Sequence, residues 1–201
     1  MDMPDFIQYL RQFGRLTPED VAAIREVTRA VSLPKDTRFM EAATIPRELC
    51  FVLEGVTRVY YYTEAGKEVT KYFIDEGNVS VDASNYLYRL PTMAYCETVT
   101  DCRMLCISRD AFDKLADRIS GWNELFLRLL AHGMSEKVNR ISPMLAETAE
   151  ERYLNFQERF PGVHNRIPQH LLASYIGVTK SSLSRIRRQV MVAEKDASTA
   201  D

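Results

Sequence analysis

Residues 169–188, QHLLASYIGVTKSSLSRIRR, limit the possible folds of this chain more than any other segment. The small residues Ala173 and Gly177 would allow two short helices to approach and the chain to turn between them. This spacing predicts a helix-turn-helix, the motif that reads the major groove of DNA. A solvated cationic helix is the alternative, but amphipathic periodicity alone does not explain small residues at these two offsets. The apolar residues that would pack the two helices together are Leu172, Ile176, Val178, Leu183 and Ile186.

The polar residues of the same segment suit contacts with DNA. Thr179 is placed to cap the second helix by accepting a hydrogen bond from the amide of Ser181 or Ser182. Lysine and arginine donate to guanine or to phosphate, and serine bonds to either. The residues expected on the polar faces of this helix are Lys180, Ser181, Ser184, Arg185 and Arg188.

The net charge of −2 is unevenly distributed along the chain. Residues 166–190 contain five Lys and Arg residues and no Asp or Glu, whereas the segments on either side are net acidic. Phosphate is therefore attracted to one end of the molecule only. The remainder is not expected to be a general nucleic-acid surface.

The composition is that of a globular protein with one large or two small domains, since 46% of its 201 residues are hydrophobic. There is no run of about 18 apolar residues that would span a membrane. The start, MDMPDFIQYLRQF, is too polar and acidic for a signal peptide. We therefore expect a cytoplasmic protein without membrane contact.

The four cysteines, Cys50, Cys96, Cys102 and Cys106, contain no CxxC pair. The last three fall in a segment with the character of β-strands, where a cysteine behaves as a small hydrophobe. We expect reduced thiols in the core. A redox or metal-binding role for Cys96, Cys102 and Cys106 is the alternative.

The first half of the chain predicts two helices followed by short strands. The helices cover residues 5–13 and residues 17 to about 30, the second beginning with a capping box at Thr17 and Pro at its first position. Of Tyr60, Tyr61 and Tyr62, one is expected in the core and two on the surface. Short strands at this spacing predict a β-sandwich or jelly roll, and hence an α+β fold. The expected strands are residues 38–40, 49–54, 57–63, 69–74, 93–99 and 103–107.

From Arg109 onward the pattern is helical, and it contains a heptad seam spaced 4, 3, 4, 3, 4. A strict 3.5-residue period favours a symmetric partner, so we expect a dimerisation helix; packing of the seam on the chain's own β-domain is the alternative. Pro143 is expected to kink or end this helix, which makes residues 142–149 a candidate hinge. The seam residues are Leu127, Ala131, Met134, Val138, Ile141 and Leu145.

Taken together, these features resemble the Crp/Fnr family of transcription regulators. The resemblance rests on Glu54-Gly55 closing a strand, a hairpin at Gly66, Gly77 after an aromatic strand, the long helix and the LLASYIGVTKSSLSRIRR run. It implies a double-stranded β-helix (jelly roll) of the cyclic-nucleotide-binding type, a dimerisation helix and a helix-turn-helix. It also implies double-stranded DNA with palindromic sites, a second copy of the chain and RNA polymerase as partners.

The resemblance assigns roles to individual residues of the helix-turn-helix. Lys180, Ser181 and Arg185 take base-contacting positions, and Ser181 stands where an acidic residue is common. A hydroxyl is a less selective partner than a carboxylate, so the preferred DNA site is expected to differ from that of better-known relatives. Contacts with the phosphate backbone of DNA are expected from Gln169, Thr179, Ser182, Arg187 and Arg188.

The ligand side departs from the family pattern. Relatives that bind cyclic AMP have a Gly-Glu pair and then Pro-Arg-Ser/Thr-Ala, in which the arginine pairs with the cyclic phosphate. Here Thr92 follows Pro91, and no Glu lies between Gly77 and Pro91. We therefore expect no tight binding of cyclic AMP or cyclic GMP, although Arg89 is a possible substitute for the arginine.

The sequence does not identify the effector. Its candidate pocket is assigned from the segment that follows Gly77. Ser135 or Asn139 of the long helix is expected to act as a lid. The candidate pocket residues are Val79, Ser80, Asp82, Ser84, Asn85, Arg89, Thr92 and Met93.

Other cofactors and enzymatic activity are not expected. The chain has no cysteine before Cys50 for an N-terminal iron-sulfur cluster, and only His132 on the long helix is available for haem. Metal-dependent jelly-roll enzymes need several histidines, and none lies between Leu33 and Ser108. The remaining alternative is a protein-interaction or small-ligand-binding module that uses apolar residues exposed around residues 86–90.

The expected organisation has five parts. Residues 1–30 are the N-terminal helices, 31–108 the β-roll, 109–147 the dimerisation helix and hinge, and 148–190 the helix-turn-helix domain. Residues 191–201 are polar and expected to be disordered, so the β-wing that usually follows the recognition helix is expected to be missing.

Overall fold

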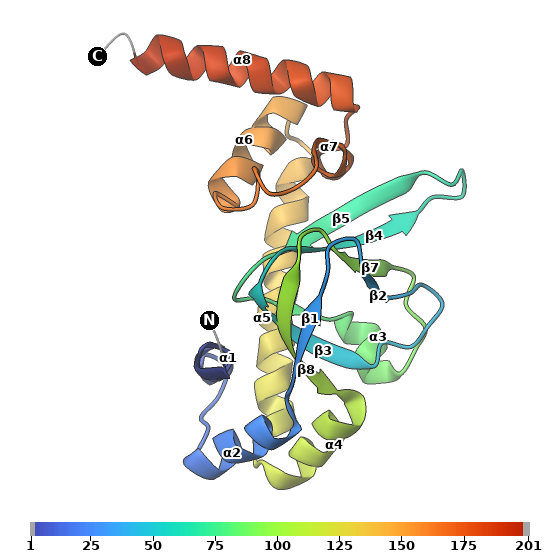
Figure 1. Cartoon of the computed structure of the whole chain (residues 1–201), viewed down its shortest axis with the longest axis vertical. Helices are drawn as coiled ribbons and strands as arrows, with labels where there is room; N and C mark the ends of the chain where they lie inside the picture. The colour runs from blue at the N-terminus through green and yellow to red at the C-terminus, as the bar shows by residue number, and fades with distance from the viewer. Residues whose placement is uncertain (1–2, 199–201) are drawn as a thin grey trace.

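The computed structural model of the chain describes the backbone of residues 3–198 and side chains through Val192. A β-roll lies in the middle, with helices α2 and α4 at one end, α1 beside the lower part of the roll, and α6, α7 and α8 at the other end (Figure 1). The long helix α5 (Trp122–Met144) runs past the roll from one end to the other and so connects them.

The β-roll consists of two four-stranded antiparallel sheets, ordered β1-β8-β3-β6 and β2-β7-β4-β5. This arrangement confirms the predicted α+β jelly roll. Two strands were not foreseen, β1 and the two-residue β6. The strands are β1 (Arg29–Leu33), β2 (Arg38–Met40), β3 (Glu48–Glu54), β4 (Thr57–Tyr62), β5 (Glu68–Ile74), β6 (Val79–Ser80), β7 (Tyr95–Thr98) and β8 (Cys102–Ser108).

Strands β3 and β8 are covered on both faces, which explains their nearly continuous apolar sequences. On one face, Val52 and Met104 pack between the two sheets. On the other face, Phe51 and Leu105 join the core formed with the helices. Tyr60 is also buried, whereas Tyr61 and Tyr62 are exposed, which confirms the expectation of one core and two surface tyrosines.

The N-terminal helices are α1 (Met3–Arg11) and α2 (Pro18–Val27). The predicted capping box is confirmed: the Asp20 amide donates to Thr17 Oγ1 at 3.2 Å, and the Thr17 amide donates to Asp20 Oδ2 at 2.9 Å. The expectation that α2 continues to Ala30 is wrong. The chain leaves the helix at Thr28 because residues from Arg29 onward pair with β8.

The helical region after the β-roll is divided. Helix α4 (Arg109–Arg118) ends before Gly121, whose φ of 81° turns the chain into α5. The first half of α5 buries Trp122, Leu125 and Phe126, and much of its second half is exposed. The helix ends one residue after Pro143, as predicted. A short helix, α3 (Ala83–Tyr88), interrupts the segment that carries the candidate pocket residues.

The expectation of four reduced cysteines is wrong for one pair. Cys50 and Cys106 form a disulfide between β3 and β8, because the antiparallel register places them opposite each other with their Cα atoms 4.1 Å apart. Glu48 lies beside this pair, but a disulfide offers no thiolate to a metal. Cys96 and Cys102 are free and buried, and burial raises the pKa of Cys96 to about 12.

The C-terminal helices are α6 (Ala149–Arg159), α7 (Gln169–Ile176) and α8 (Lys180–Ser198). The expectation that residues 191–201 are disordered is wrong for residues 191–198, because α8 continues to Ser198. Residues 199–201 lie outside the described part of the chain. Residues 191–198 contain good helix formers such as Ala, Glu and Lys. No strand follows α8 within the described residues. Likewise, none of the helices described is both long and apolar enough to cross a membrane.

A candidate DNA interface and a pocket beside the long helix

The predicted helix-turn-helix is present, formed by α7 and α8. Gly177 has a φ of 84°, a conformation that glycine adopts without strain, and its amide donates to the Ala173 carbonyl at 3.0 Å. The Ser182 amide donates to Thr179 Oγ1 at 3.1 Å, which confirms the predicted cap of α8. The small and apolar residues of the motif are inside as expected: Leu172, Ala173, Ile176, Leu183 and Ile186 are buried.

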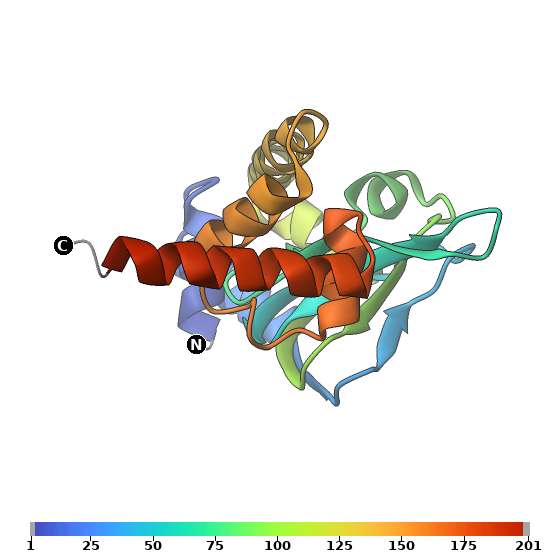
Figure 2. The ribbon, with the colours of Figure 1, turned by 90° about the horizontal axis from the view of Figure 1, so that it is seen from above.

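The outer face of α8 is basic, and its cations have no acidic partner among the side chains that the structure describes. Figure 2 shows α8 lying across the end of the molecule, on the outside. Lys180, Arg185, Arg187 and Arg188 form no ion pair with any described side chain. Water therefore screens their charge, and a polyanion is free to approach them. Of the eight predicted DNA-binding residues, Gln169, Thr179, Lys180, Ser181, Arg185 and Arg188 are exposed, and Ser182 and Arg187 are partly buried.

Helix α7 is anchored to the β-roll of the same chain. The Thr70 amide of β5 donates to Ser174 Oγ at 3.0 Å, and the rings of Phe73 and Tyr175 pack with their centroids 5.6 Å apart. Arg166 donates to Glu76 at 2.7 Å. Burial raises the pKa of Glu76, but hydrogen bonds, led by that from Arg166, hold it below its usual value. The helix-turn-helix is thus held in one orientation on the roll.

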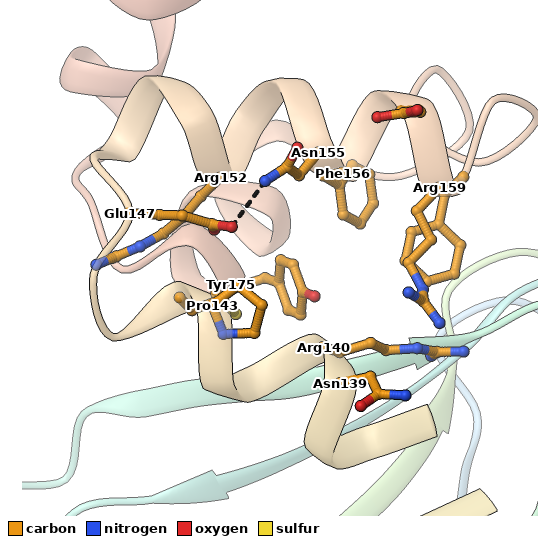
Figure 3. Close-up of a pocket in the computed structure, with 12 residues that line it drawn as sticks. Asn139, Arg140, Pro143, Glu147, Arg152, Asn155, Phe156, Arg159 and Tyr175 are labelled. Carbon is orange, nitrogen blue, oxygen red and sulfur yellow. Dashed lines mark hydrogen bonds between the residues drawn. The ribbon is translucent and has the colours of Figure 1, made fainter. Parts of the chain in front are cut away.

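A second set of contacts joins α5 to α6 and α7 around a cavity of about 370 Å³, here called the hinge pocket. Figure 3 shows the Tyr175 ring in this pocket and the Arg140 and Arg159 side chains close together. Asn155 donates to Glu147 at 2.7 Å, and Arg152 Nη1 donates to the Ile176 carbonyl at 2.9 Å, just before the turn of the motif. These contacts couple the end of α5 to the helix-turn-helix.

A different cavity, of about 340 Å³, lies between the β-roll and α5 and is here called the α5 pocket. Two candidate pocket residues, Asp82 and Ser84, line it. The Lys137 ammonium lies over the Tyr72 ring, 4.7 Å from its centroid, and forms no hydrogen bond or ion pair with the described residues. Burial lowers the pKa of Lys137, while the charge of Asp82 raises it. The lining residues are Val59, Lys71, Tyr72, Asp82, Ala83, Ser84, Ala94, Met134, Lys137, Val138, Ile141 and Ser142.

The other candidate pocket residues lie elsewhere. Ser80 and Arg89 line a larger cavity of about 820 Å³ around the connection from β2 to β3. Arg89 is bonded to Asp113 at 3.0 Å there, and it does not line the α5 pocket. The Thr92 hydroxyl is buried and donates to Asp82. The four candidate residues that line neither cavity are Val79, Asn85, Thr92 and Met93.

Neither expected lid residue lies at the α5 pocket. Asn139 lines the hinge pocket instead, and Ser135 is exposed and lines none of the three cavities. The expectation of exposed apolar residues at 86–90 holds for Tyr88 and Leu90, but Tyr86 is fully buried because its ring packs against Phe112.

The predicted seam of α5 lies on the surface of the single chain. Leu145 is 85% exposed and Leu127 is 64% exposed, which is unusual for large apolar side chains. Met134, Val138 and Ile141 also line the α5 pocket. The two features therefore share one face of the helix. The remaining seam residue, Ala131, is exposed as well.

Sequence reasoning missed Lys137 and the arginines of the hinge pocket. In the heptad, Lys137 directly precedes the seam residue Val138, and charged residues at such flanking positions usually form salt bridges between helices. Its distinctive surroundings arise from β4, β5 and α3, which are far away in the sequence. Only knowledge of how the roll packs on α5 could have identified it.

Comparison with known proteins agrees with this architecture. Residues 30–118 match the family of cyclic nucleotide-binding domains. FixK2 from Bradyrhizobium japonicum is similar over 84% of this chain and 86% of its own, with a TM-score of 0.71 and 18% identity. No curated protein matches the chain.

Two other solved structures extend this comparison. A putative transcriptional regulator of the Crp/Fnr family from Eubacterium rectale covers 89% of this chain and 85% of its own, with a TM-score of 0.68 and 15% identity. The catabolite activator protein of Thermus thermophilus covers 92% and 88%, with a TM-score of 0.56 and 20% identity. The predicted resemblance is confirmed: residues 30–118 match the model of cyclic nucleotide-binding domains, and the chain has the fold seen in the solved structures of Crp/Fnr regulators.

Proposed function

We propose that this protein is a transcription regulator that binds palindromic DNA as a homodimer and whose β-roll senses a ligand other than a cyclic nucleotide. The observation that carries the proposal is the basic outer face of α8. Its cations form no ion pair with a described side chain, and the cap at Thr179 and the anchored α7 hold the helix rigidly on the roll. A recognition helix requires this combination of accessible donors and fixed orientation.

The homodimer is supported by the exposed seam of α5. Its large apolar side chains are between 48% and 85% exposed in the single chain and follow the 3.5-residue period of a coiled coil. Two copies joined along α5 would carry two recognition helices related by a two-fold axis. Such an arrangement matches a palindrome with half-sites about one helical turn apart.

The absence of tight cyclic AMP binding is supported by the position of Thr92. Its buried hydroxyl is occupied by Asp82, and that carboxylate would repel an added phosphate. Arg89 lines the larger cavity instead and donates to Asp113. A cyclic phosphate would therefore lack the guanidinium that makes charge-assisted, bidentate bonds.

A route from ligand to DNA is supported by the contacts of α5. Its central part lines the α5 pocket, and its end contacts α6 and α7 in the hinge pocket. Arg152 then bonds to the carbonyl of Ile176 at the turn before α8. A ligand that shifts α5 would thereby change the orientation of the recognition helices.

Selection of bound sequences from a random pool of DNA duplexes tests the proposal, run with and without cyclic AMP. We expect the same palindrome to be enriched in both arms. Dependence of enrichment on cyclic AMP would contradict the ligand part of the proposal. If no motif emerges in either arm, the protein-interaction module becomes the better interpretation.

The dimer has its own test in Leu127→Glu, which places two like charges across the seam and outside the α5 pocket. We expect sedimentation equilibrium to show monomers and affinity for the palindrome to fall by about 100-fold or more, because like charges in an interface cost several kcal/mol. Leu154→Glu is the matched control, since Leu154 is an exposed leucine on α6. A dimer that survives Leu127→Glu would exclude α5 as its interface.

A further inference from the structure

We infer that the Cys50–Cys106 disulfide is a site of thiol-disulfide exchange, in which Cys50 is attacked by a small amino-acid or peptide thiol that enters the cavity of about 820 Å³ beside it. The product is a mixed disulfide on Cys50 and a free thiol on Cys106. This chemistry of the β-roll does not depend on the proposed function.

The disulfide lies in a row of residues that crosses the sheet β1-β8-β3-β6. Cys106 of β8 is opposite Arg29 of β1 on one side and Cys50 of β3 on the other. Cys50 is in turn opposite Ser80 of β6. Opposite residues of antiparallel strands share one face of the sheet, and both cysteines belong to the core between the two sheets. The two sulfurs therefore face the interior of the roll.

The cavity meets the disulfide at Cys50. Glu48, Cys50 and Ser80 line this cavity, whereas Cys106 lines none of the three cavities described above. A thiolate attacks a disulfide sulfur in line with the bond that breaks, from the side away from the leaving sulfur. For Cys50 that is the side of β6, where Ser80 lines the cavity. A thiol in the cavity is thus placed to bond to Cys50 and to expel Cys106.

The exchange needs no other reactant. The entering thiolate forms a bond to Cys50 Sγ while the bond between Cys50 Sγ and Cys106 Sγ breaks, and the electron pair of that bond leaves on Cys106. The Cys106 thiolate then takes up from water the proton that the entering thiol lost. A second molecule of the thiol can attack the outer sulfur of the mixed disulfide and release Cys50, which completes the reduction of the protein and oxidises the thiol to its own disulfide.

The negative charge nearest the sulfurs is that of Glu48. One of its carboxylate oxygens lies within 4.8 Å of both sulfur atoms. A bare carboxylate at this place would repel an entering thiolate. Arg29, however, donates to Glu48 at 2.6 Å and offsets its charge. The approach to Cys50 is thereby left open to a thiolate.

The lining of the cavity indicates the class of thiol. Arg47 and Asp110 form no ion pair with a described side chain, so each is available to a ligand group of opposite charge. An amino-acid or short-peptide thiol carries a carboxylate and an ammonium and can satisfy both. A cavity of about 820 Å³ is within the range of small-molecule sites. The charged residues that line it are Glu41, Arg47, Glu48, Arg89, Arg109 and Asp110.

The two free cysteines are poor substitutes for an external thiol. Cys96 lies next to the row, with its Sγ 3.4 Å from Ser80 Oγ, but burial raises its pKa to about 12, so little thiolate forms near neutral pH. Burial also raises the pKa of Cys102. Neither residue lines the cavity. Both therefore serve as internal controls that a reagent in the cavity should leave unmodified.

The attacked sulfur is identified with a matched pair of variants of the full chain, Cys106→Ser and Cys50→Ser, each of which frees one thiol of the pair. Glutathione disulfide is the probe, because its reaction with a thiolate gives the same mixed disulfide in stable form. We expect the adduct to form at Cys50 at least about tenfold faster than at Cys106, since only Cys50 lines the cavity. Peptide mass spectrometry measures both rates, and circular dichroism confirms that the variants are folded.

The route through the cavity is tested on the oxidised wild type with reduced glutathione. Opening of the disulfide is followed by alkylation of the released thiols. We expect its rate to rise with glutathione concentration and to be unchanged by urea below the unfolding transition. A route through the unfolded chain would instead give a rate that follows the population of unfolded protein.

The class of thiol is tested by comparing glutathione with 2-mercaptoethanol, which carries no charged group, at equal concentrations of thiolate. Arg47→Ala is expected to slow the reaction with glutathione by about threefold or more, as loss of one charged contact requires, and to leave that with 2-mercaptoethanol unchanged. Arg25→Ala is the control, since Arg25 is an exposed arginine on α2 that lines none of the three cavities.

Four results would overturn the inference. They are no adduct on either variant, an adduct that forms at Cys106 as fast as at Cys50, opening of the wild-type disulfide only as the protein unfolds, and equal slowing of both thiols by Arg47→Ala. None of these measurements involves DNA. Failure of the exchange site and failure of the proposed regulator are therefore distinguished.

Discussion

Helix α8 and the α5 pocket both present cations that form no ion pair with the described side chains, but the surroundings of these cations differ. Lys180, Arg185 and Arg188 of α8 are exposed, so water solvates them. Lys137 is partly buried between α5 and the β-roll, where solvation is poorer. An unpaired cation in water costs nothing and shows only that an anion has access. A partly buried cation is less well solvated, so the same lack of an ion pair lowers stability more there.

Among the substitutions that test this comparison, the largest effect is expected at Arg185, which is assigned to a contact with a base. Arg185→Ala should weaken binding to the selected site by about 1–3 kcal/mol and relax discrimination at one base pair, because a bidentate contact to a base is lost. Repeating the selection with the variant measures both. Unchanged discrimination at every position would show that Arg185 contacts only the backbone.

Arg187 and Arg188 are expected to act differently from Arg185. Replacing both with Ala should weaken binding to all sequences and reduce the slope of log K against log[salt] by about 2, because two phosphate contacts are lost. Fluorescence anisotropy over a range of salt concentrations measures this slope. Arg166→Ala is the internal comparison, since Arg166 is already paired with Glu76 and its loss should alter the slope less.

The same contrast explains which features could be predicted from the sequence. The helix-turn-helix lies within 20 residues, and its spacing, turn glycine and cap at Thr179 are local. Lys137 acquires its meaning from strands and a helix that lie more than 40 residues earlier, so no local pattern marks it. The predictable site is thus the one whose parts are neighbours in sequence.

Pairing between distant strands limited the prediction of the fold in a similar way. Cys50 and Cys106 are 56 residues apart, and only the register of β3 against β8 places them opposite each other. Strand β1 was assigned in part to a helix because it is stabilised by pairing with β8 rather than by local preference. Strand β6 pairs through two residues only, too few for a detectable alternation.

The contrast between exposed and buried cations predicts opposite effects of removing them on stability. Lys137→Met should raise the free energy of unfolding of the ligand-free protein by about 1 kcal/mol, because an unpaired charge is replaced by an apolar side chain of similar length. Urea unfolding measures the difference. Lys67→Met should leave stability within about 0.5 kcal/mol, as expected for a surface position.

This stability measurement also separates two roles for Lys137. If the lysine is a structural element of the pocket, its replacement must destabilise the protein. If it is an unpaired charge that the fold tolerates, the variant must be more stable than the wild type. Loss of stability in Lys137→Met would therefore remove the comparison between the two sites.

The smallest expected effect is the pH dependence of the difference in stability between Lys137→Met and the wild type. Burial, together with the charges of Lys71 and Arg140, lowers the pKa of Lys137, whereas Asp82 opposes this shift. Between the lowered folded value and the usual 10.5, the unfolded chain therefore binds more protons at this site than the folded chain. The stability of the wild type rises with pH in this window relative to Lys137→Met.

The advantage of Lys137→Met should accordingly be largest near neutral pH and shrink as the pH approaches 10.5. Urea unfolding of both proteins at several pH values measures it, and Lys67→Met corrects for the removal of a surface lysine. An advantage that grows with pH would mean that the folded protein stabilises the ammonium. Lys137 would then have a partner already, and the difference between the pocket and the face of α8 would disappear.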